Sequence, residues 1–357
     1  SRGLGDVYKR QVCCRFAFKP SLKDIAVSQK VSICLLGPKG AGKSSLLGSL
    51  ADCVGQGAYG YSPNFHPVLQ PISQVDFLKG PIDRQRADFL THALTPYERL
   101  KQDLVAGAAA TNTLDTYEYY FRLSLSDVAA RDLKQAGPWL LEIIDSAGDI
   151  AMPRDGAQIA LLDDVKTKLA KQILASDAIV LALPLTRFDE AEWSGSLSRL
   201  ADRLMLAKEK NIKRFVVALT FYERLFMNLG PDAFTYACDP SVARHVLRKS
   251  LRSSNCFDHI RKLMTSDSGL QLRFTVCSTF GFTKRFQNPN LDPWLAGEQR
   301  FRRNGLSDGR AYSEFWRPFL TAEPFLYAAL GLDSAFTFSF DQLNGETSGR
   351  HEALKIY

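Results

Sequence analysis

The stretch KVSICLLGPKGAGKSSLLGSLADCV, Lys30 to Val54, decides the fold because a glycine-rich turn joins a strand pattern to a helix pattern. Its start, Lys30 to Gly37, is a short apolar run typical of a buried strand, and its end has the periodicity of a helix. Between them, the residues Gly37 to Ser44 match G-x-x-x-x-G-K-[ST]. Because this motif lies between a strand and a helix, it predicts a phosphate-binding loop.

Each residue type in this loop has a physical role in holding phosphate. The glycines let the backbone curl, so that successive N–H groups converge on phosphate oxygens at the positive end of the following helix. Lys43 is expected to reach the outer phosphates, and the Ser44 hydroxyl to bind Mg²⁺. The predicted nucleotide contacts in the loop are Gly37, Pro38, Lys39, Gly40, Ala41, Gly42, Lys43, Ser44 and Ser45.

A second motif lies in LLEIIDSAGD, Leu140 to Asp149, where an acidic residue ends an apolar strand pattern. A buried carboxylate is costly unless a cation compensates it, and Mg²⁺ bound to the phosphates would do so. Asp145 is therefore predicted to hold the metal. Asp145 to Gly148 also form D-x-x-G, in which the backbone N–H of Gly148 is expected to approach the terminal phosphate.

Apolar strand patterns alternate with helical patterns along the rest of the chain. This alternation predicts an α/β fold with a mostly parallel, six-stranded sheet and helices on both faces. The expected strands are residues 30–37, 116–125, 139–148, 177–185, 214–220 and 271–279, the second and third forming a hairpin. The expected helices include residues 83–93, 157–174, 192–210 and 240–264 and the segment AEPFLYAALG near the end.

The 357 residues suffice for one large α/β domain with insertions. The start resembles a translated sequencing adapter, and the end has only one short alternating segment, at Phe336, Phe338 and Phe340. The expected organisation is a non-native leader at 1–11, an N-terminal extension at 12–29, a domain at 30–332 with insertions at about 55–110 and 281–318, and a tail or linker at 333–357.

Composition narrows the class of protein. Hydrophobic residues make up 45% and charged residues 23%, which is ordinary globular usage. No run approaches the roughly 20 apolar residues of a membrane span, so we expect a cytoplasmic protein without one. The formal charge of +7 is scattered and does not indicate a specific nucleic-acid partner. The seven cysteines show no C-x-x-C pair, so buried reduced thiols are expected.

The two motifs together resemble the translation-factor-related (TRAFAC) class of P-loop GTPases, and more loosely bacterial double-GTPase-type domains of multi-gene conflict and signalling systems. The resemblance covers roughly residues 30–332 and implies the three-layer P-loop NTPase fold. In that class a threonine before the second strand closes over Mg²⁺ and the last phosphate. The segment ATNTLDTYEYYF offers Thr111, Thr113 and Thr116, of which Thr113 has the most suitable distance to the strand. The implied catalytic residues are Lys43, Asp145, Gly148 and Thr113, and the implied metal ligands are Ser44, Asp145 and Thr113.

The class usually reads guanine with [NT]-K-x-D, and this chain departs from that pattern. In LTFYERL, Thr220 matches, Phe221 replaces the lysine, and Glu223 stands at the aspartate. Glu223 would accept hydrogen bonds from two guanine N–H donors while Phe221 stacks on the base. A strand end entering a helix explains the same residues equally well. The segment VCSTF supplies Ser278 for the last base-contacting loop of the class.

These observations lead us to expect a Mg²⁺-dependent GTP-binding switch that hydrolyses GTP slowly and signals to a partner protein. Slow hydrolysis is expected because Asp149 stands where Ras-like members often have a water-orienting glutamine. Arg154 lies near this loop, where an arginine can stabilise transition-state charge, although a surface role explains it more simply. Two alternatives stay open: a P-loop ATPase or nucleotide kinase, and an assembly module that retains nucleotide with vestigial hydrolysis.

Overall fold

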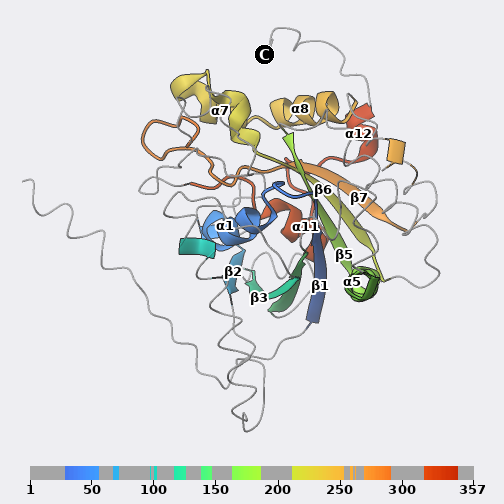
Figure 1. Ribbon diagram of the computed structural model, residues 1–357. Helices are drawn as coiled ribbons and strands as arrows, with labels where there is room; N and C mark the ends of the chain where they lie inside the picture. Colours follow the sequence, from blue (N-terminus) through green and yellow to red (C-terminus); the bar gives the residue numbers. More distant parts are fainter. Residues whose placement is uncertain are drawn as a thin grey trace, which may run out of the picture.

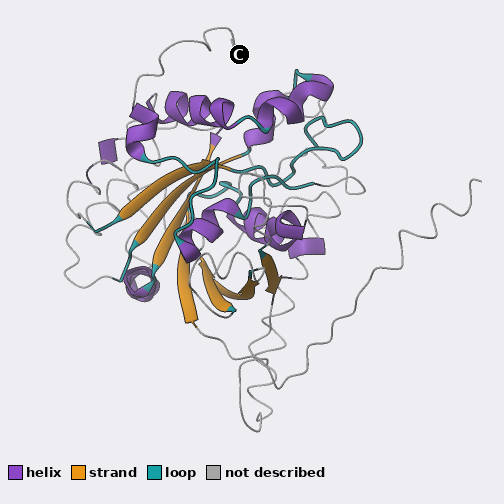
Figure 2. Cartoon of the chain, turned by 180° about the vertical axis from the view of Figure 1, so that it is seen from behind, coloured by secondary structure: helices purple, strands orange, loops and turns teal. Residues whose placement is uncertain are grey.

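The computed structural model describes residues 29–55, 67–71, 97, 100–102, 116–125, 138–146, 163–185, 211–252, 258–259, 262, 269–290 and 317–344. Within these residues the chain forms a seven-stranded sheet with helices on both faces (Figures 1 and 2). The expected leader, the N-terminal extension up to residue 28, and the helices expected at 83–93 and 192–210 lie outside the described residues.

The sheet is mixed, with the order β2-β3-β4-β1-β5-β6-β7. Neighbouring strands from β4 to β7 run parallel, whereas β2 and β3, and β3 and β4, pair antiparallel. The strands are β1 (Gln29–Leu36), β2 (Val68–Pro71), β3 (Tyr117–Ser124), β4 (Trp139–Asp145), β5 (Ala178–Pro184), β6 (Arg214–Thr220) and β7 (Gln271–Val276). The predicted mostly parallel α/β sheet and the antiparallel pairing of β3 with β4 are confirmed.

The predicted number of strands is wrong, because β2 was missed. Its four residues, Val68–Pro71, end in a proline, and of them only the Leu69 side chain is buried. So short a segment contains no readable alternation, and a proline is tolerated because β2 lies at the edge of the sheet. The strand falls inside the region that the sequence indicated as an insertion.

Strand sequence follows burial across the sheet. All seven residues of β5 are buried, as expected for a central parallel strand covered on both faces. In β3 the buried residues Tyr119, Phe121 and Leu123 alternate with more exposed ones, because one face of this strand is less covered. The continuous apolar run of β5 is therefore typical of a strand covered on both faces, and the alternating pattern of β3 is typical of a strand with one less covered face.

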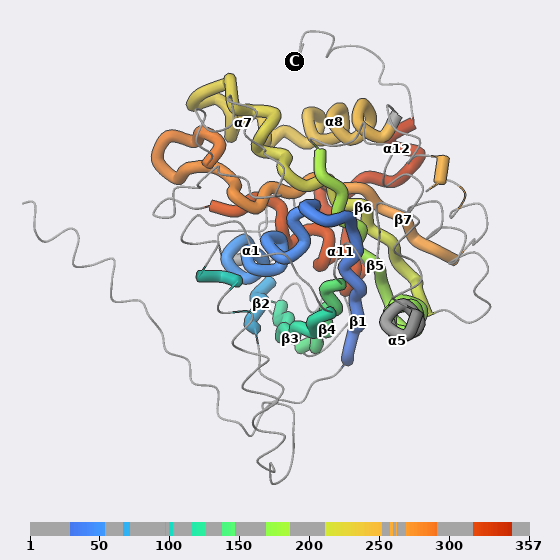
Figure 3. Tube along the Cα trace, in the orientation of Figure 1, coloured from blue at the N-terminus to red at the C-terminus, as the bar shows by residue number. Residues whose placement is uncertain are grey.

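Helices cover both faces of the sheet (Figure 3). An apolar core lies on each face. In β1, Ile33 and Leu35 face one core, and Cys34 and Leu36 face the other. Side chains of α1 (Lys43–Gly55) and α11 (Glu323–Leu330) fill the first core, whereas α5 (Asp163–Ala175), α7 (Ala233–Ala237), α8 (Pro240–Arg252) and α12 (Phe340–Asn344) contribute to the second. The predicted packing of α11 onto the sheet is confirmed.

Residues 333–344, which the sequence placed in a tail, pack against the sheet instead. Phe338 exchanges two backbone hydrogen bonds of 2.9 Å with Phe274 of β7. Phe336 and Leu343 are also buried. The alternating phenylalanines of this segment therefore bury one side against the edge strand, and the packed structure continues to at least Asn344.

The ends of the region expected as a long insertion after β7 are held together by backbone pairing. Ser278 pairs with Phe319, and Gly281 with Arg317, as isolated bridges. Gly281 has a positive φ of 67°, and a Cβ there would collide with the backbone of Arg317. This close approach requires glycine and fixes the loop that follows β7.

Candidate nucleotide-binding site

The glycine-rich loop connects the carboxyl end of β1 to the start of α1 and has the backbone that its glycines allow. Gly37, Gly40 and Gly42 have φ values of 152°, 77° and 78°, which other residues rarely adopt. A Cβ at Gly37 would also collide with the carbonyl oxygen of Ala182 in β5. Glycine is therefore needed at position 37 for two reasons, a left-handed backbone and a close neighbour strand.

Lys43, the first residue of α1, is buried with its ammonium group turned onto the loop. Its Nζ donates hydrogen bonds to the carbonyl oxygens of Gly37, at 2.9 Å, and Pro38, at 3.3 Å. Both acceptors are neutral. The positive charge therefore sits at the centre of the loop, on the side of the sheet where α1 begins.

Asp145 is brought beside this loop because β4 is the parallel neighbour of β1, with Leu35 in register with Asp145. The side chain is completely buried. The Ser44 hydroxyl donates a hydrogen bond of 3.1 Å to Asp145 Oδ2. Among the described residues no group donates to the other oxygen, Oδ1. Ser44 and Asp145, each predicted to bind the metal, thus lie within hydrogen-bond distance of each other, and one buried carboxylate oxygen has no partner among the described residues.

Burial raises the pKa of Asp145 from its ordinary 3.8 to about 6, although the Lys43 ammonium and the Ser44 hydrogen bond lower it. Desolvation therefore outweighs both favourable contacts. A hard cation suits such a site, because Ser44 and Asp145 offer only oxygen ligands and Asp145 Oδ1 needs a partner. The described residues contain no group of three His, Cys, Asp or Glu side chains, so phosphate or water would complete the coordination of a metal.

Thr220, at the end of β6, contacts the backbone of the glycine-rich loop through its hydroxyl. Its hydroxyl lies 2.8 Å from the carbonyl oxygen of Ala41 and 3.2 Å from that of Leu183, and the side chain is buried. A hydroxyl has one proton, so it donates to one of these carbonyls at a time. The geometry gives this predicted nucleotide-binding residue a contact with the loop backbone.

Glu223 and Ser278, predicted to contact the base, are both buried and lie close together. Neither carboxylate oxygen of Glu223 accepts a hydrogen bond of good geometry from the described residues. Burial raises the pKa of Glu223, opposed by the nearby Ser278 hydroxyl and the Arg224 guanidinium. The Ser278 hydroxyl itself accepts a hydrogen bond of 3.0 Å from the Gly281 N–H. A second buried carboxylate therefore lacks good partners, in the turn after β6.

Phe221 caps the 3₁₀ helix η4 (Tyr222–Phe226) with a left-handed backbone, φ 64° and ψ 31°. Its ring lies against Gly42, where an added Cβ would be 3.4 Å from the ring atom Cζ. The guanidinium carbon of Arg224 lies 4.4 Å from the ring centroid. Sequence analysis missed Arg224, although residues three apart share one side of a 3₁₀ helix.

The remaining predicted loop residues, Pro38, Lys39, Gly40, Ala41 and Ser45, lie on the loop or in the first turn of α1. The predicted switch residues Thr113 and Gly148 lie outside the described residues, and so do Asp149 and Arg154. Their roles stay predictions.

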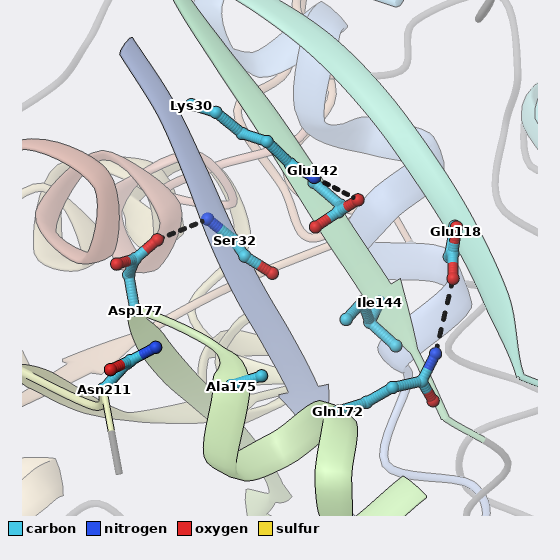
Figure 4. Close-up of a pocket in the computed structure, with 9 residues that line it drawn as sticks. All are labelled: Lys30, Ser32, Glu118, Glu142, Ile144, Gln172, Ala175, Asp177 and Asn211. Carbon is cyan, nitrogen blue, oxygen red and sulfur yellow. Dashed lines mark hydrogen bonds and ion pairs between the residues drawn. The ribbon is translucent and has the colours of Figure 1, made fainter. Parts of the chain in front are cut away.

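A pocket of about 440 Å³ lies on the face covered by α5, toward the start of β1 (Figure 4). Lys30 forms an ion pair of 2.8 Å with Glu142, and Gln172 donates to Glu118 at 3.3 Å. The lining residues are Lys30, Ser32, Glu118, Glu142, Ile144, Gln172, Ala175, Asp177 and Asn211. None belongs to the glycine-rich loop, which follows the end of β1, so this pocket is separate from the predicted phosphate site.

The described cysteines Cys34, Cys53, Cys238 and Cys277 are free thiols, and all but Cys238 are fully buried. This agrees with the prediction of buried reduced thiols for Cys34, Cys53 and Cys277, whereas Cys238 is a free thiol that is only partly buried. In the described part of the chain, no helix has both the length and the hydrophobicity needed to cross a membrane.

Comparisons with known proteins return distant likenesses in structure alone. No family model and no curated protein matches the chain. The Ski7 GTPase-like domain of S. cerevisiae, bound to GTP, is 14% identical over 70% of this chain and 43% of that chain, with a TM-score of 0.35. Sup35 complexed with GDP is 14% identical over 73% of this chain and 40% of that chain, with a TM-score of 0.29. This chain thus spans less than half of either structure, and likenesses at this level carry no argument about its function.

Proposed function

We propose that this chain binds GTP together with Mg²⁺ at the loop Gly37–Ser45 and hydrolyses GTP slowly as a molecular switch. The observation that carries the proposal is the buried Asp145 carboxylate. Ser44 donates to one of its oxygens, and its other oxygen has no partner among the described residues. A divalent cation held between phosphate and this pair would compensate a charge that is otherwise expensive to bury.

The loop supplies the phosphate contacts in this proposal. The positive φ values of its glycines would allow backbone N–H groups of the loop to turn toward phosphate oxygens, at the positive end of α1. Lys43 donates to the neutral carbonyl oxygens of Gly37 and Pro38 through the two hydrogen bonds described above. Exchanging these neutral acceptors for phosphate oxygens would place the Lys43 ammonium against a negative charge, so that an ion pair replaces hydrogen bonds to uncharged carbonyls.

Transfer of the terminal phosphoryl group to water is the proposed reaction. Bound Mg²⁺ would neutralise charge that develops on the phosphate oxygens. Ser44, Asp145 and the proposed ligand Thr113 would hold it, while Lys43 stabilises charge and the backbone of Gly148 binds the terminal phosphate. The presence of Asp149 in place of a water-orienting glutamine supports a low intrinsic rate.

Guanine is the proposed base because Glu223 is a buried carboxylate without good hydrogen-bond donors. The two adjacent N–H donors on the edge of guanine match a carboxylate, whereas adenine has a donor and an acceptor there. Ser278 lies beside Glu223, and Thr220 supports the loop from the same turn. These three positions extend the proposed site from the phosphates to the base.

Two other functions remain to be tested against this one. A P-loop ATPase or nucleotide kinase would use the same loop, and an assembly module would retain nucleotide with vestigial hydrolysis. The degenerate base motif, with Phe221 and Glu223, is the observation that favours these alternatives. Signalling to a protein partner in the cytoplasm, within a bacterial multi-protein system, is the wider setting that the class resemblance supports.

Phosphate release from GTP and ATP, measured over several turnovers with and without Mg²⁺, tests the proposal. We expect slow, Mg²⁺-dependent release from GTP that Asp145→Asn abolishes. Faster release from ATP would favour the ATPase, and transfer to an added nucleoside monophosphate would favour a kinase. Tight GTP binding with no turnover would favour the assembly module.

A further inference from the structure

The pocket on the α5 face lies where the start of β1 is paired on one side only, within the described part of the sheet. β1 pairs with β4 from Gln29 onward but with β5 only from Ile33 onward. The pocket of about 440 Å³ lies beside this start of β1 and is lined by Lys30 and Ser32. Its volume falls in the range of about 300 to 1,000 Å³ that is typical of small-ligand pockets.

The lining of this pocket has a surplus of negative charge. Three carboxylates, those of Glu118, Glu142 and Asp177, face one ammonium, that of Lys30. Lys30 pairs with Glu142, so Glu118 and Asp177 are the two carboxylates without a cationic partner among the described residues. The last turn of α5, which forms one wall, has no basic residue, and the carboxyl end of a helix is partly negative. The pocket therefore favours a cation.

Both of the remaining carboxylates accept hydrogen bonds from neutral donors. Glu118 accepts from the Tyr120 hydroxyl at 2.9 Å and from the Gln172 amide at 3.3 Å. Asp177 accepts from the backbone N–H of Ser32 at 2.9 Å. These donors supply no positive charge, so an ammonium group would add an ion pair at each carboxylate.

The arrangement of these groups decides which kind of cation fits. In Figure 4, Asp177 lies on one side of the pocket and Glu118 on the other, with Ala175 and Ile144 between them. Two ammonium groups joined by methylenes match two carboxylates separated by apolar carbon. A metal ion does not match, because no group of three His, Cys, Asp or Glu side chains in the part of the chain that the structure describes could hold one.

We infer that this pocket binds a small linear diamine, with one ammonium group at Glu118, the other at Asp177, and the methylenes against Ile144 and Ala175. The inference goes beyond the proposed function and does not depend on it, because no residue of the glycine-rich loop lines the pocket. The ion pairs lie near solvent, so the affinity is expected to fall as salt is added.

Calorimetric titration of 1,4-diaminobutane into the purified chain at low salt tests this inference. We expect saturable binding of a single diamine per chain. The monoamine 1-aminobutane forms one ion pair fewer and should bind about 3- to 10-fold more weakly, and butane-1,4-diol should not bind. Absence of saturation, or equal binding of the diamine and the monoamine, would overturn the inference. N-acetyl-lysine amide stands in for a basic side chain of a protein, and binding as tight as that of the diamine would overturn the assignment to a free diamine.

Substitutions in the pocket locate the binding. Glu118→Gln and Asp177→Asn each remove one charge and keep an oxygen for the neutral donors, and each should weaken the diamine about 3- to 10-fold. Asp341→Asn is the matched control, because Asp341 is exposed on α12 and does not line the pocket, so the affinity should not change. An equal loss in this control would show that overall charge, and not the pocket, attracts the diamine.

A variant that changes the shape of the pocket without changing its charge gives a second test. Ala175→Leu narrows the pocket and should also weaken the diamine at least about 3-fold. Thermal melts of all the variants identify any that fail to fold. Diamine affinity that is unchanged in the folded variants Glu118→Gln, Asp177→Asn and Ala175→Leu would overturn the inference.

Discussion

Replacing Asp145 with Asn distinguishes the effect of this carboxylate on folding stability from its proposed role in binding the metal. In the folded chain the pKa of Asp145 is raised from 3.8 to about 6 by burial. Each pKa unit corresponds to 1.36 kcal/mol, so ionising this group costs the folded state on the order of 3 kcal/mol at neutral pH. Asp145→Asn removes the ionisation and keeps an oxygen for the Ser44 hydroxyl. Without metal, the variant should therefore be more stable than the wild type, by up to about 3 kcal/mol.

The sign of the pH dependence follows from the direction of the shift. A carboxyl with a raised pKa binds more protons in the folded than in the unfolded state between pH 3.8 and about 6. The wild type therefore loses stability relative to the variant as pH rises through this window. At pH 4 both side chains are largely neutral, and the advantage of Asp145→Asn should fall well below about 1 kcal/mol.

Urea unfolding in EDTA at pH 7.5 and pH 4, followed by circular dichroism, measures both differences. Asp341→Asn is the control, because Asp341 is exposed on α12 and should show no difference at either pH. Two results would contradict the claim that burying the Asp145 charge destabilises the folded state. One is an Asp145→Asn variant that is less stable than the wild type at pH 7.5, and the other is a variant that is more stable by the same amount at both pH values. Phosphate release by the same variant should be lost, which dissociates stability from activity.

Three further predictions follow from separate features of the structure. Titration between pH 5 and 8 measures the Mg²⁺-dependent affinity of the wild type for GTP. This affinity should fall as pH drops below about 6, because Asp145 is then protonated. An affinity that does not change with pH would exclude Asp145 as a metal ligand. Gly42→Ala should cost roughly 1 to 3 kcal/mol of stability, because φ is 78°, a backbone conformation that residues with a side chain rarely adopt. Unchanged urea unfolding would contradict this. Phe338→Ala should cost about 3 to 5 kcal/mol of stability by urea unfolding, because Phe338 is buried. The exposed control Phe286→Ala should cost under about 0.5 kcal/mol. Equal losses for the two variants would show that the segment after Leu332 adds no stability.

The sequence predicted well those parts of the site where a motif coincides with a strong periodic pattern. The apolar run before Gly37 and the helical run after Ser44 predict a strand, a loop and a helix, and β1 and α1 form there. The strand that ends at Asp145 was also predicted, and the structure makes it the parallel neighbour of β1. Parallel neighbours bring their carboxyl ends to one edge of a sheet. The contact between Ser44 and Asp145, 101 residues apart in sequence, follows from that rule.

Other features depend on tertiary contacts that no local pattern carries. β2 is too short and too rich in proline to show alternation, and it forms because β3 offers it an edge. The packing of Phe338 on β7 joins segments that are far apart in the chain. Likewise, Thr220 has the residue type of a base-reading motif, but its hydroxyl contacts the loop. The residue types predicted that Thr220 belongs to the site, but the atom that it contacts depends on how β6 packs beside the loop.

Equilibrium titration of a fluorescent GTP analogue into purified protein, with Mg²⁺ and then with EDTA, tests the central claim most directly. We predict saturable binding with Mg²⁺ that weakens in EDTA and is lost in Lys43→Ala, while an ATP analogue binds more weakly than the GTP analogue. Absence of binding, or binding that neither EDTA nor Lys43→Ala changes, would contradict the assignment of this loop and of Asp145 to a nucleotide and its metal.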